Sequence, residues 1–318
     1  MPTWTAVIAL LFSFGLDLWW SGRPVSRWHP MVWMRKYMGW MGGRIAPRAP
    51  MPSPDWLAFS AGALGWYGGA SVAVMLAWLF QWAAISLLDS ALAGLALGAM
   101  LKTMMSWRLH RLEVIKVETA LAQSLDAGRQ QLGRLADCEA TDLDEAEVRE
   151  SAIESLAANL SFWVVAPVFW FLVAGLPGAV FYRFANTAGV MWGYRGFCAG
   201  ADWEWAGKWA ALADDVLSWL PSRITAVLIG VLAGGLPWRE LRREAGRTPS
   251  SNRGWPTAAM ALALGRRLRK PGDRVLNRTA GMPQPGDTAR ALTLSGRAVA
   301  VLLAWACLAY FLAWERPW

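Results

Sequence analysis

Cysteine, histidine and charge are scarce in this chain of 318 residues. Its three cysteines, at positions 138, 198 and 307, are too few and too widely spaced for a disulfide framework or a zinc pattern. Two histidines exclude a histidine-rich metal site. Charged residues make up 17% of the chain, against about a quarter in ordinary globular proteins. The composition therefore argues against an ordinary soluble domain.

Common catalytic signatures are also missing. The sequence has no Gly-x-x-x-x-Gly-Lys-Ser/Thr phosphate loop, no Gly-x-Gly-x-x-Gly and no His-Glu-x-x-His. These absences exclude P-loop nucleotide binding, the usual dinucleotide fingerprint and the common zinc-protease motif. The net charge of +8 falls mainly in loops between apolar runs. Because nucleic-acid binding needs a basic patch on a recognisable module, no nucleic-acid partner is expected.

Apolar residues are abundant instead. Hydrophobic residues make up 55% of the chain, and many of the 23 tryptophans stand near the ends of apolar runs, where membrane-interface aromatics occur. The sequence predicts an all-α fold, a polytopic helical integral membrane protein with cytoplasmic helical loops, forming a single domain over 1–318. Its candidate spans are 3–20, 56–80, 83–101, 161–182, 217–235 and 294–314.

The loops suggest an orientation. Residues 23–54 contain six basic residues and no acid, and residues 236–292 hold a second basic cluster. Such surplus marks cytoplasmic loops, so a bacterial inner-membrane, multi-pass location is expected with 23–54 and 236–292 on the cytoplasmic side. The apolar stretch 56–101 is long enough for two crossings, which returns 102–158 to the same side. Within 102–158, apolar residues at helical spacing predict a helix over 108–135. A Thr141-x-x-Asp144 box predicts the start of a second helix.

Prolines interrupt two of the apolar runs. The "GLPG" stretch at 175–178 predicts either a kinked span or a re-entrant hairpin. Pro221 predicts that the helix carrying Asp214 and Asp215 ends or kinks near Leu220, because proline breaks a helix interior. Such a break would hold both aspartates at the membrane surface.

Polar residues gather at the ends of the apolar runs, and ionisable groups at membrane depth are costly and usually functional. Carboxylates suit Mg²⁺, and arginines suit phosphate oxygens. Glu150 and Glu154 share a helical face, which requires a cation between them, either a metal or a basic side chain. Each polar residue also has a purely structural interpretation, as a cap, a turn or a solvated face. The set as a whole favours a phosphate-bearing substrate, and its members are Asp17, His29, Asp137, Glu154, Asn159, Arg183, Asn186, Thr187, Asp214, Asp215, Arg223 and Asn252.

At these residues the chain resembles a known family, the membrane-bound adenosylcobinamide-phosphate synthases of cobalamin biosynthesis, or CobD/CbiB proteins. The likeness covers nearly the whole chain. The segments that show it are "LDLWW" with "WHPMVWM" near the start, "AIESLAANLSFWVVAPVFW" at 152–170, "GLPGAVFYRFANTAGVMWGY" at 175–194, "AALADDVLSWLPSRITAVLIG" at 210–230 and "SNRGWPTAAMALALG" at 251–265.

The resemblance implies ATP-dependent amide ligation of aminopropanol phosphate to adenosylcobyric acid, with ATP and Mg²⁺ as cosubstrate and ion and neither tightly bound. It implies a corrinoid substrate, inner-membrane lipid and other cobalamin-biosynthesis membrane proteins as partners. Three sets of site residues are expected on this basis: Asp137, Glu154, Asn159, Asp214 and Asp215 as catalytic; His29, Arg183, Asn186, Thr187, Tyr194, Arg223 and Asn252 as substrate- or phosphate-binding; and Asp214, Asp215 and Glu154 as metal ligands.

Several motif positions depart from the family pattern. Polar residues are replaced at Ala136, Ala158, Phe162, Gly189 and Ser218. Three of the lost groups are carboxylates and one is an arginine. An alternative therefore stands beside the ligase, namely a catalytically altered paralogue that acts as a membrane regulatory or assembly protein, as the related AmpE-like proteins do. A transporter is a weaker third possibility, because no inverted repeat is visible.

Overall fold

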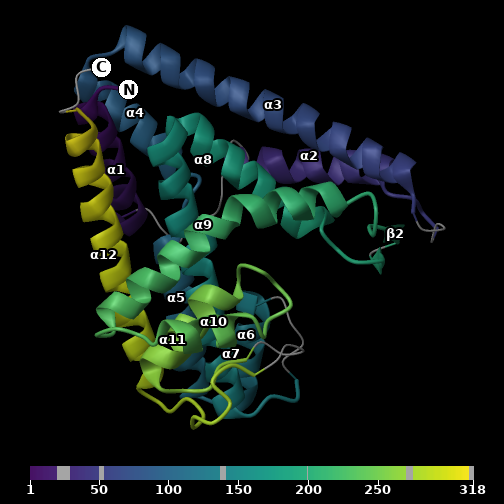
Figure 1. Cartoon of the computed structure of the whole chain (residues 1–318), viewed down its shortest axis with the longest axis vertical. Coiled ribbons are helices and arrows are strands. Elements are labelled where there is room, and N and C mark those ends of the chain that lie inside the picture. Colours follow the sequence, from purple (N-terminus) through teal and green to yellow (C-terminus); the bar gives the residue numbers. More distant parts are fainter. Residues whose placement is uncertain (20–28, 50–53, 137–140, 199, 270–274, 315–318) are drawn as a thin grey trace. The chain divides into compact units, whose positions relative to one another are not determined.

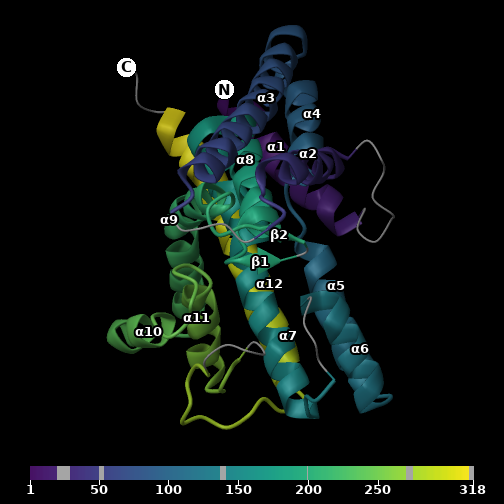
Figure 2. The ribbon, with the colours of Figure 1, turned by 90° about the vertical axis from the view of Figure 1, so that its right-hand side faces the viewer.

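The computed structural model describes residues 1–19, 29–49, 54–136, 141–198, 200–269 and 275–314, and it is almost entirely helical (Figures 1 and 2). The described segments contain one two-residue hairpin, in which β1 (Phe197–Cys198) pairs antiparallel with β2 (Ala201–Asp202). Four helices are long and apolar enough to cross a membrane: Trp56–Leu87, Glu145–Trp192, Lys208–Leu232 and Asp287–Leu312. The predicted all-α membrane fold is thereby confirmed.

The chain forms two compact units. Unit 1 comprises Met1–Met105, Pro167–Ser218 and Ala309–Trp318, and unit 2 comprises Ser106–Ala166 and Trp219–Leu308. Neither is continuous in sequence, because long helices run from one into the other. The expectation of one domain over 1–318 stays a prediction.

In unit 1, α1 (Thr3–Trp19) packs along α4 (Ser90–Lys102). Gly94 and Gly98 make the close approach possible. A methyl group at Gly98 would lie 2.6 Å from the carbonyl oxygen of Ala9, and one at Gly94 would lie 2.7 Å from Ile8. Small residues spaced four apart let the backbones of two membrane helices approach each other closely.

The remaining helices of the first part of unit 1 are α2 (Pro30–Ile45) and α3 (Trp56–Leu87). The break expected between 80 and 83 is absent, because α3 continues to Leu87. The chain turns instead at Asp89, whose carboxylate accepts from the backbone N–H groups of Ala91 and Leu92 and caps α4. Asp89 is therefore an N-cap, and not a residue inside a span, as the candidate span 83–101 would have made it.

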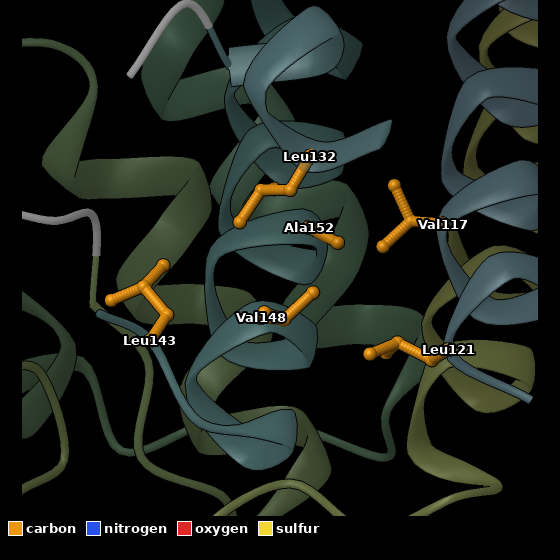
Figure 3. Close-up of a cluster of buried hydrophobic side chains, with 6 residues drawn as sticks. All are labelled: Val117, Leu121, Leu132, Leu143, Val148 and Ala152. Carbon is orange, nitrogen blue, oxygen red and sulfur yellow. The ribbon is translucent and has the colours of Figure 1, made fainter. Parts of the chain in front are cut away.

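Unit 2 has its own apolar core, formed by α5 (Trp107–Leu121), α6 (Leu125–Ala136) and α7 (Glu145–Leu160). Figure 3 shows six of its side chains, contributed by the three helices and the turn before α7: Val117, Leu121, Leu132, Leu143, Val148 and Ala152. The single helix expected over 108–135 is two helices. The capping box begins three residues later than expected, at Asp144 instead of Thr141. The Asp144 carboxylate accepts from the backbone N–H of Glu147.

A five-residue π-helix, η1 (Ser161–Val165), follows α7 directly. The backbone N–H of Ser106 donates to the carbonyl of Trp163 at 3.3 Å, so an outside partner satisfies one carbonyl of this widened turn. Short π-segments inside helices occur frequently at functional sites. One of the altered motif positions, Phe162, lies in it.

After η1 the chain enters α8 (Ala166–Trp192), which is broken at the "GLPG" stretch. Ala174 and Gly175 have non-helical backbone angles, with φ of +65° at Gly175. The side-chain oxygen of Gln81 in α3 accepts from the backbone N–H of Leu176 at 2.8 Å and so caps the second half of α8. The structure therefore supports a kinked helix at this stretch.

The last long helices are α9 (Lys208–Leu232) and α12 (Asp287–Trp314), with the short α10 (Trp238–Ala245) and α11 (Gly254–Leu264) between them. The sequence predicts that the helix ends or kinks near Leu220. An end there is wrong, because α9 continues through Pro221, and a kink stays a prediction. Proline has no N–H to offer the carbonyl of Leu217 four residues earlier. The indole N–H of Trp170 donates to that carbonyl at 3.0 Å instead.

Candidate functional site

Unit 1 contains a chain of hydrogen bonds between α8 and α9. Arg183 is fully buried, and its guanidinium donates to the carbonyl of Met104 at 3.0 and 2.6 Å and to the side-chain oxygen of Asn186 at 3.1 Å. The amide nitrogen of Asn186 then donates to Asp214 Oδ1 at 3.1 Å. The three residues thus form one relay, in which Arg183 orients Asn186 and Asn186 orients the carboxylate.

The same carboxylate oxygen accepts a second hydrogen bond. The hydroxyl of Ser218 donates to Asp214 Oδ1 at 3.1 Å, and Ser218 lies 3.2 Å from the hydroxyl of Tyr182. Gly189 abuts the carboxylate, since a methyl group there would lie 2.8 Å from Asp214 Oδ2. The result is a half-buried carboxylate fixed by an amide and a hydroxyl, which is the arrangement expected of a positioned base or ligand.

The two adjacent aspartates have different environments. Asp214 is half-buried in this network, whereas Asp215 is exposed. Neighbouring residues on a helix point about 100° apart, so one of them can enter the network while the other faces outward. Thr187, one turn after Arg183, donates its hydroxyl to the Arg183 carbonyl at 2.7 Å.

In unit 2, arginines bind the two glutamates that share a face of α7. Arg253 donates two parallel bonds of 2.7 Å to the two oxygens of Glu154, and Arg267 donates to Glu150 at 3.1 Å. Both glutamates are buried. The cation that the sequence required between them is thus a pair of arginines, each pairing with one glutamate. Paired in this way, the two carboxylates join α7 to the 253–267 segment.

The residue before Arg253 fixes a third arginine. Asn252 Oδ1 accepts from Arg223 Nη1 at 2.6 Å, and the carbonyl of Ser251 accepts from Nη2 at 3.2 Å. The rings of Trp219 and Trp255 lie 4.6 and 4.7 Å from the same guanidinium. Cation–π contacts of this kind add to the hydrogen bonds in holding Arg223 in place.

The remaining candidates are dispersed. Asn159 lies in unit 2, its amide nitrogen 3.3 Å from His110 Nδ1. His29 caps α2 by accepting from the backbone N–H of Met31 at 3.3 Å. Tyr194 is 48% exposed, after the end of α8. Asp17 lies 2.8 Å from Lys102 in unit 1. Asp137 falls outside the described residues.

Sequence reasoning missed Arg253, Ser218 and the carbonyl of Met104. The "SNRG" motif placed Arg253 beside a chosen asparagine, and that adjacency was the available signal. Ser218 stood out only as a departure from the family pattern, yet it holds Asp214. Every residue has a backbone carbonyl, so the sequence could not single out the carbonyl of Met104.

The residues do not fit a magnesium site built by the protein alone. Mg²⁺ takes carboxylate and phosphate oxygens. Both oxygens of Glu154 already accept from Arg253, and Asp214 Oδ1 accepts from Asn186 and Ser218. Across the described ranges, no three His, Cys, Asp or Glu side chains are grouped to hold a metal. Asp215, being exposed, is the one of the three proposed ligands whose position leaves it open to solvent.

Comparison with known proteins gives a consistent result. A model of the CobD/CbiB protein family matches residues 10–305. The chain is 33% identical to a probable cobalamin biosynthesis protein CobD of Methanothermobacter thermautotrophicus, over 85% of this chain and 86% of the relative. It is 33% identical to the corresponding protein of Thermococcus kodakarensis, over 91% and 90%. It is 38% identical to cobalamin biosynthesis protein CobD of Chromobacterium violaceum, over 77% and 75%. No solved structure matches the chain.

Proposed function

Since the chain belongs to the CobD/CbiB family and has a role in cobalamin biosynthesis, we propose that it joins aminopropanol phosphate to adenosylcobyric acid through an amide bond, using ATP. The observation that supports this most directly is the family match over 10–305, within which lies the fixed Asp214 carboxylate. We place the protein in the bacterial inner membrane as a multi-pass protein, where the corrinoid is its substrate.

The chemistry requires activation, because a carboxylate is a poor electrophile. In this proposal the γ-phosphoryl group of ATP moves to the carboxylate of the corrinoid, giving an acyl phosphate and ADP. The amine nitrogen then displaces phosphate, forming the amide and releasing a proton. Since no group of three His, Cys, Asp or Glu side chains in the described ranges is placed to hold Mg²⁺, the ion would arrive with ATP and would supply neutralisation of the phosphate charge.

The residues of this chain have separate roles. Asp214 accepts the proton that the amine loses, and a base fixed by two donors needs no reorganisation at that moment. Arg183, Asn186 and Ser218 are positioning residues, because they act through Asp214. Glu154 and Arg253 hold the unit 2 cluster together, and contact of Arg223 and Asn252 with phosphate stays a prediction.

The test uses the purified chain in detergent with ATP, adenosylcobyric acid and aminopropanol phosphate. Product is followed by mass spectrometry, and complementation of a strain lacking its own synthase serves as a second readout. Asp214→Asn should lower the rate by about 100-fold or more, the lower end of what a positioned base supplies. Asp126→Asn is the matched control, because that side chain is 90% exposed on α6. A mutant as active as wild type would remove Asp214 from the mechanism.

The altered paralogue is the second candidate, and the Gly189 contact favours it. The family pattern has an aspartate where Gly189 stands, and here that position has no room for a side chain against Asp214. If the wild-type chain forms no product and does not complement, while remaining folded and membrane-inserted, the regulatory or assembly role replaces the ligase.

A further inference from the structure

Unit 2 contains a cavity of about 430 Å³ that neither cluster above uses. It is bounded by the C-terminal end of α9, the end of α11 and the first three turns of α12. The walls are mainly small or apolar, formed by Ala233, Ala263, Leu264, Ala289 and Leu294, and they are joined by Arg290, Thr293 and Arg297. Figure 1 shows the end of α9 beside α12.

The two arginines project from one face of α12. They are seven residues apart, which is close to two helical turns, and Thr293 lies between them on the same face. The Thr293 hydroxyl donates to the carbonyl of Ala289 at 2.8 Å, so its proton is already used. The charged donors of the cavity are therefore the two guanidinium groups.

The local charge is positive. Asp287 accepts from Arg290 at 3.0 Å and lies 2.7 Å from Arg266. One carboxylate is thus shared by two arginines. Arg297 forms no ion pair with any residue that the structure describes. Arg266 and Arg290 thus share one aspartate, and Arg297 adds a further positive charge at the cavity wall, so an anionic ligand is favoured.

The position of Arg297 points to the ligand's source. It lies eleven residues into a helix that is apolar and long enough to cross a membrane. A charge inside such a helix is costly unless a counter-charge lies beside it. The phosphates of a bilayer lie near the ends of a span and can supply that counter-charge. From Arg297 an exposed apolar stripe continues along α12 at helical spacing, through Val301, Trp305 and Leu308.

We propose that this cavity binds the phosphate of an anionic phospholipid, with Arg290 and Arg297 on the phosphate and an acyl chain along the stripe from Leu294 to Leu308. A free phosphate ester shares the headgroup chemistry but has no use for the stripe. The stripe is the reason for choosing the lipid over the small molecule. None of the residues that line the cavity is among the proposed ligase residues.

The experiment uses the full chain in nanodiscs of phosphatidylcholine containing a minor fraction of phosphatidylglycerol. After transfer to mild detergent, retained lipid is counted by native mass spectrometry. Wild type should retain phosphatidylglycerol. Arg290→Gln and Arg297→Gln should each lower retention by about five-fold, which is what one basic side chain gains near an anionic membrane surface. Arg239→Gln, an exposed arginine on α10 outside this cavity, should leave retention unchanged.

A further variant protects the test against loss of folding. Ala289 is exposed at the cavity, so Ala289→Leu should fill space without disturbing the core and should also lower retention, with all charges kept. Equal retention by wild type and every cavity variant overturns the proposal. So does displacement of the lipid by glycerol 1-phosphate in large excess, because that would assign the cavity to a free phosphate ester.

Discussion

Single residues in this protein have roles that depend on what each side chain contacts. Asp214 and Asp215 are neighbours of identical chemistry, yet one is fixed by Asn186 and Ser218 and the other is exposed. Glu154 carries a carboxylate that could bind a metal, yet both of its oxygens accept from Arg253. A residue type therefore sets what a side chain can do, and its contacts decide which of those roles it takes.

His29 is a residue whose contacts predict a pH effect. Its Nδ1 accepts from the Met31 N–H, and burial, with a smaller contribution from the charge of Lys102, lowers the pKa of His29 below its ordinary value of 6.5. The folded state thus favours the neutral ring, while the unfolded chain binds a proton more readily. The stabilisation is fully present above pH 6.5 and is lost as the pH falls through the lowered pKa of the folded state.

His29→Gln should therefore cost about 1 kcal/mol of cap stability at neutral pH. The difference in melting temperature between wild type and mutant should shrink as the pH is lowered below 6.5. Thermal unfolding followed by circular dichroism across this range measures both. A difference that stays constant with pH would show that His29 does not change protonation on unfolding.

Trp170 gives a second prediction at this scale. Its indole N–H replaces the backbone donor that Pro221 cannot supply to the Leu217 carbonyl. Trp170→Phe should lower the free energy of unfolding by about 1 kcal/mol through that bond, in addition to lost packing. In a Pro221→Ala background the alanine N–H is available to the same carbonyl, so the cost of Trp170→Phe should become smaller.

The four proteins of this double-mutant cycle are compared by thermal unfolding in one detergent. The coupling between the two substitutions isolates the hydrogen bond from the packing that Trp170→Phe loses in either background. Additive effects would mean that the indole bond contributes nothing.

At the scale of elements, two prolines inside apolar helices have opposite outcomes. At Pro177 the helix is broken two residues earlier, at Gly175, and Gln81 caps the new start. At Pro221 the helix continues, because its freed carbonyl finds Trp170. A proline removes one donor wherever it occurs. Whether the helix then breaks depends on a glycine that can take positive φ and on the partners that neighbouring helices offer.

The break in α8 can be tested directly. Gly175→Ala places a side chain at φ of +65°, with its methyl 2.4 Å from Gln81 Oε1. It should cost about 1–3 kcal/mol, as residues held in such conformations do. Gln81→Leu should also destabilise, because Leu176 loses its acceptor. Gly15→Ala is the control, since nothing lies within 4 Å of a methyl group there. A Gly175→Ala protein as stable as the control would show that the kink does not need glycine.

For the whole molecule, the open question is how often the chain crosses the membrane. We expect residues 45 and 270 to lie on the cytoplasmic side because their loops concentrate lysine and arginine, and residue 130 because 56–101 is long enough for two crossings. That expectation needs a second crossing after α3. The helix available for it, α4, has 13 residues, or about 20 Å of the roughly 30 Å hydrocarbon core.

Reporter fusions at the three positions decide this. Cytoplasmic signals at all three would mean that α4 and the turn after it complete the return, packed along α1. A periplasmic signal at 45 or at 130 would contradict the predicted orientation and would make α3 a single crossing with α4 ending inside the membrane.

The sequence by itself determined the helical membrane class, the polar positions at the ends of its apolar runs and the family. The class follows from composition, because apolar runs must be buried in protein or contact lipid. The family follows from the motifs, because their residues and their order can be read directly from the sequence. It also indicated the broken "GLPG" helix and the need for a cation beside Glu150 and Glu154.

Only the tertiary structure decided which group meets which. In the structure, Arg253 pairs with Glu154 and Arg267 pairs with Glu150. The indole of Trp170 binds the carbonyl that Pro221 leaves without a donor. Asn186 binds Asp214 and not Asp215. The physical reason is that such partners lie 28 to 117 residues apart in the chain. Each residue type admits several partners of suitable charge or hydrogen-bonding capacity. Which one it meets is set by where the helices pack, and a pattern of local preferences does not contain that information.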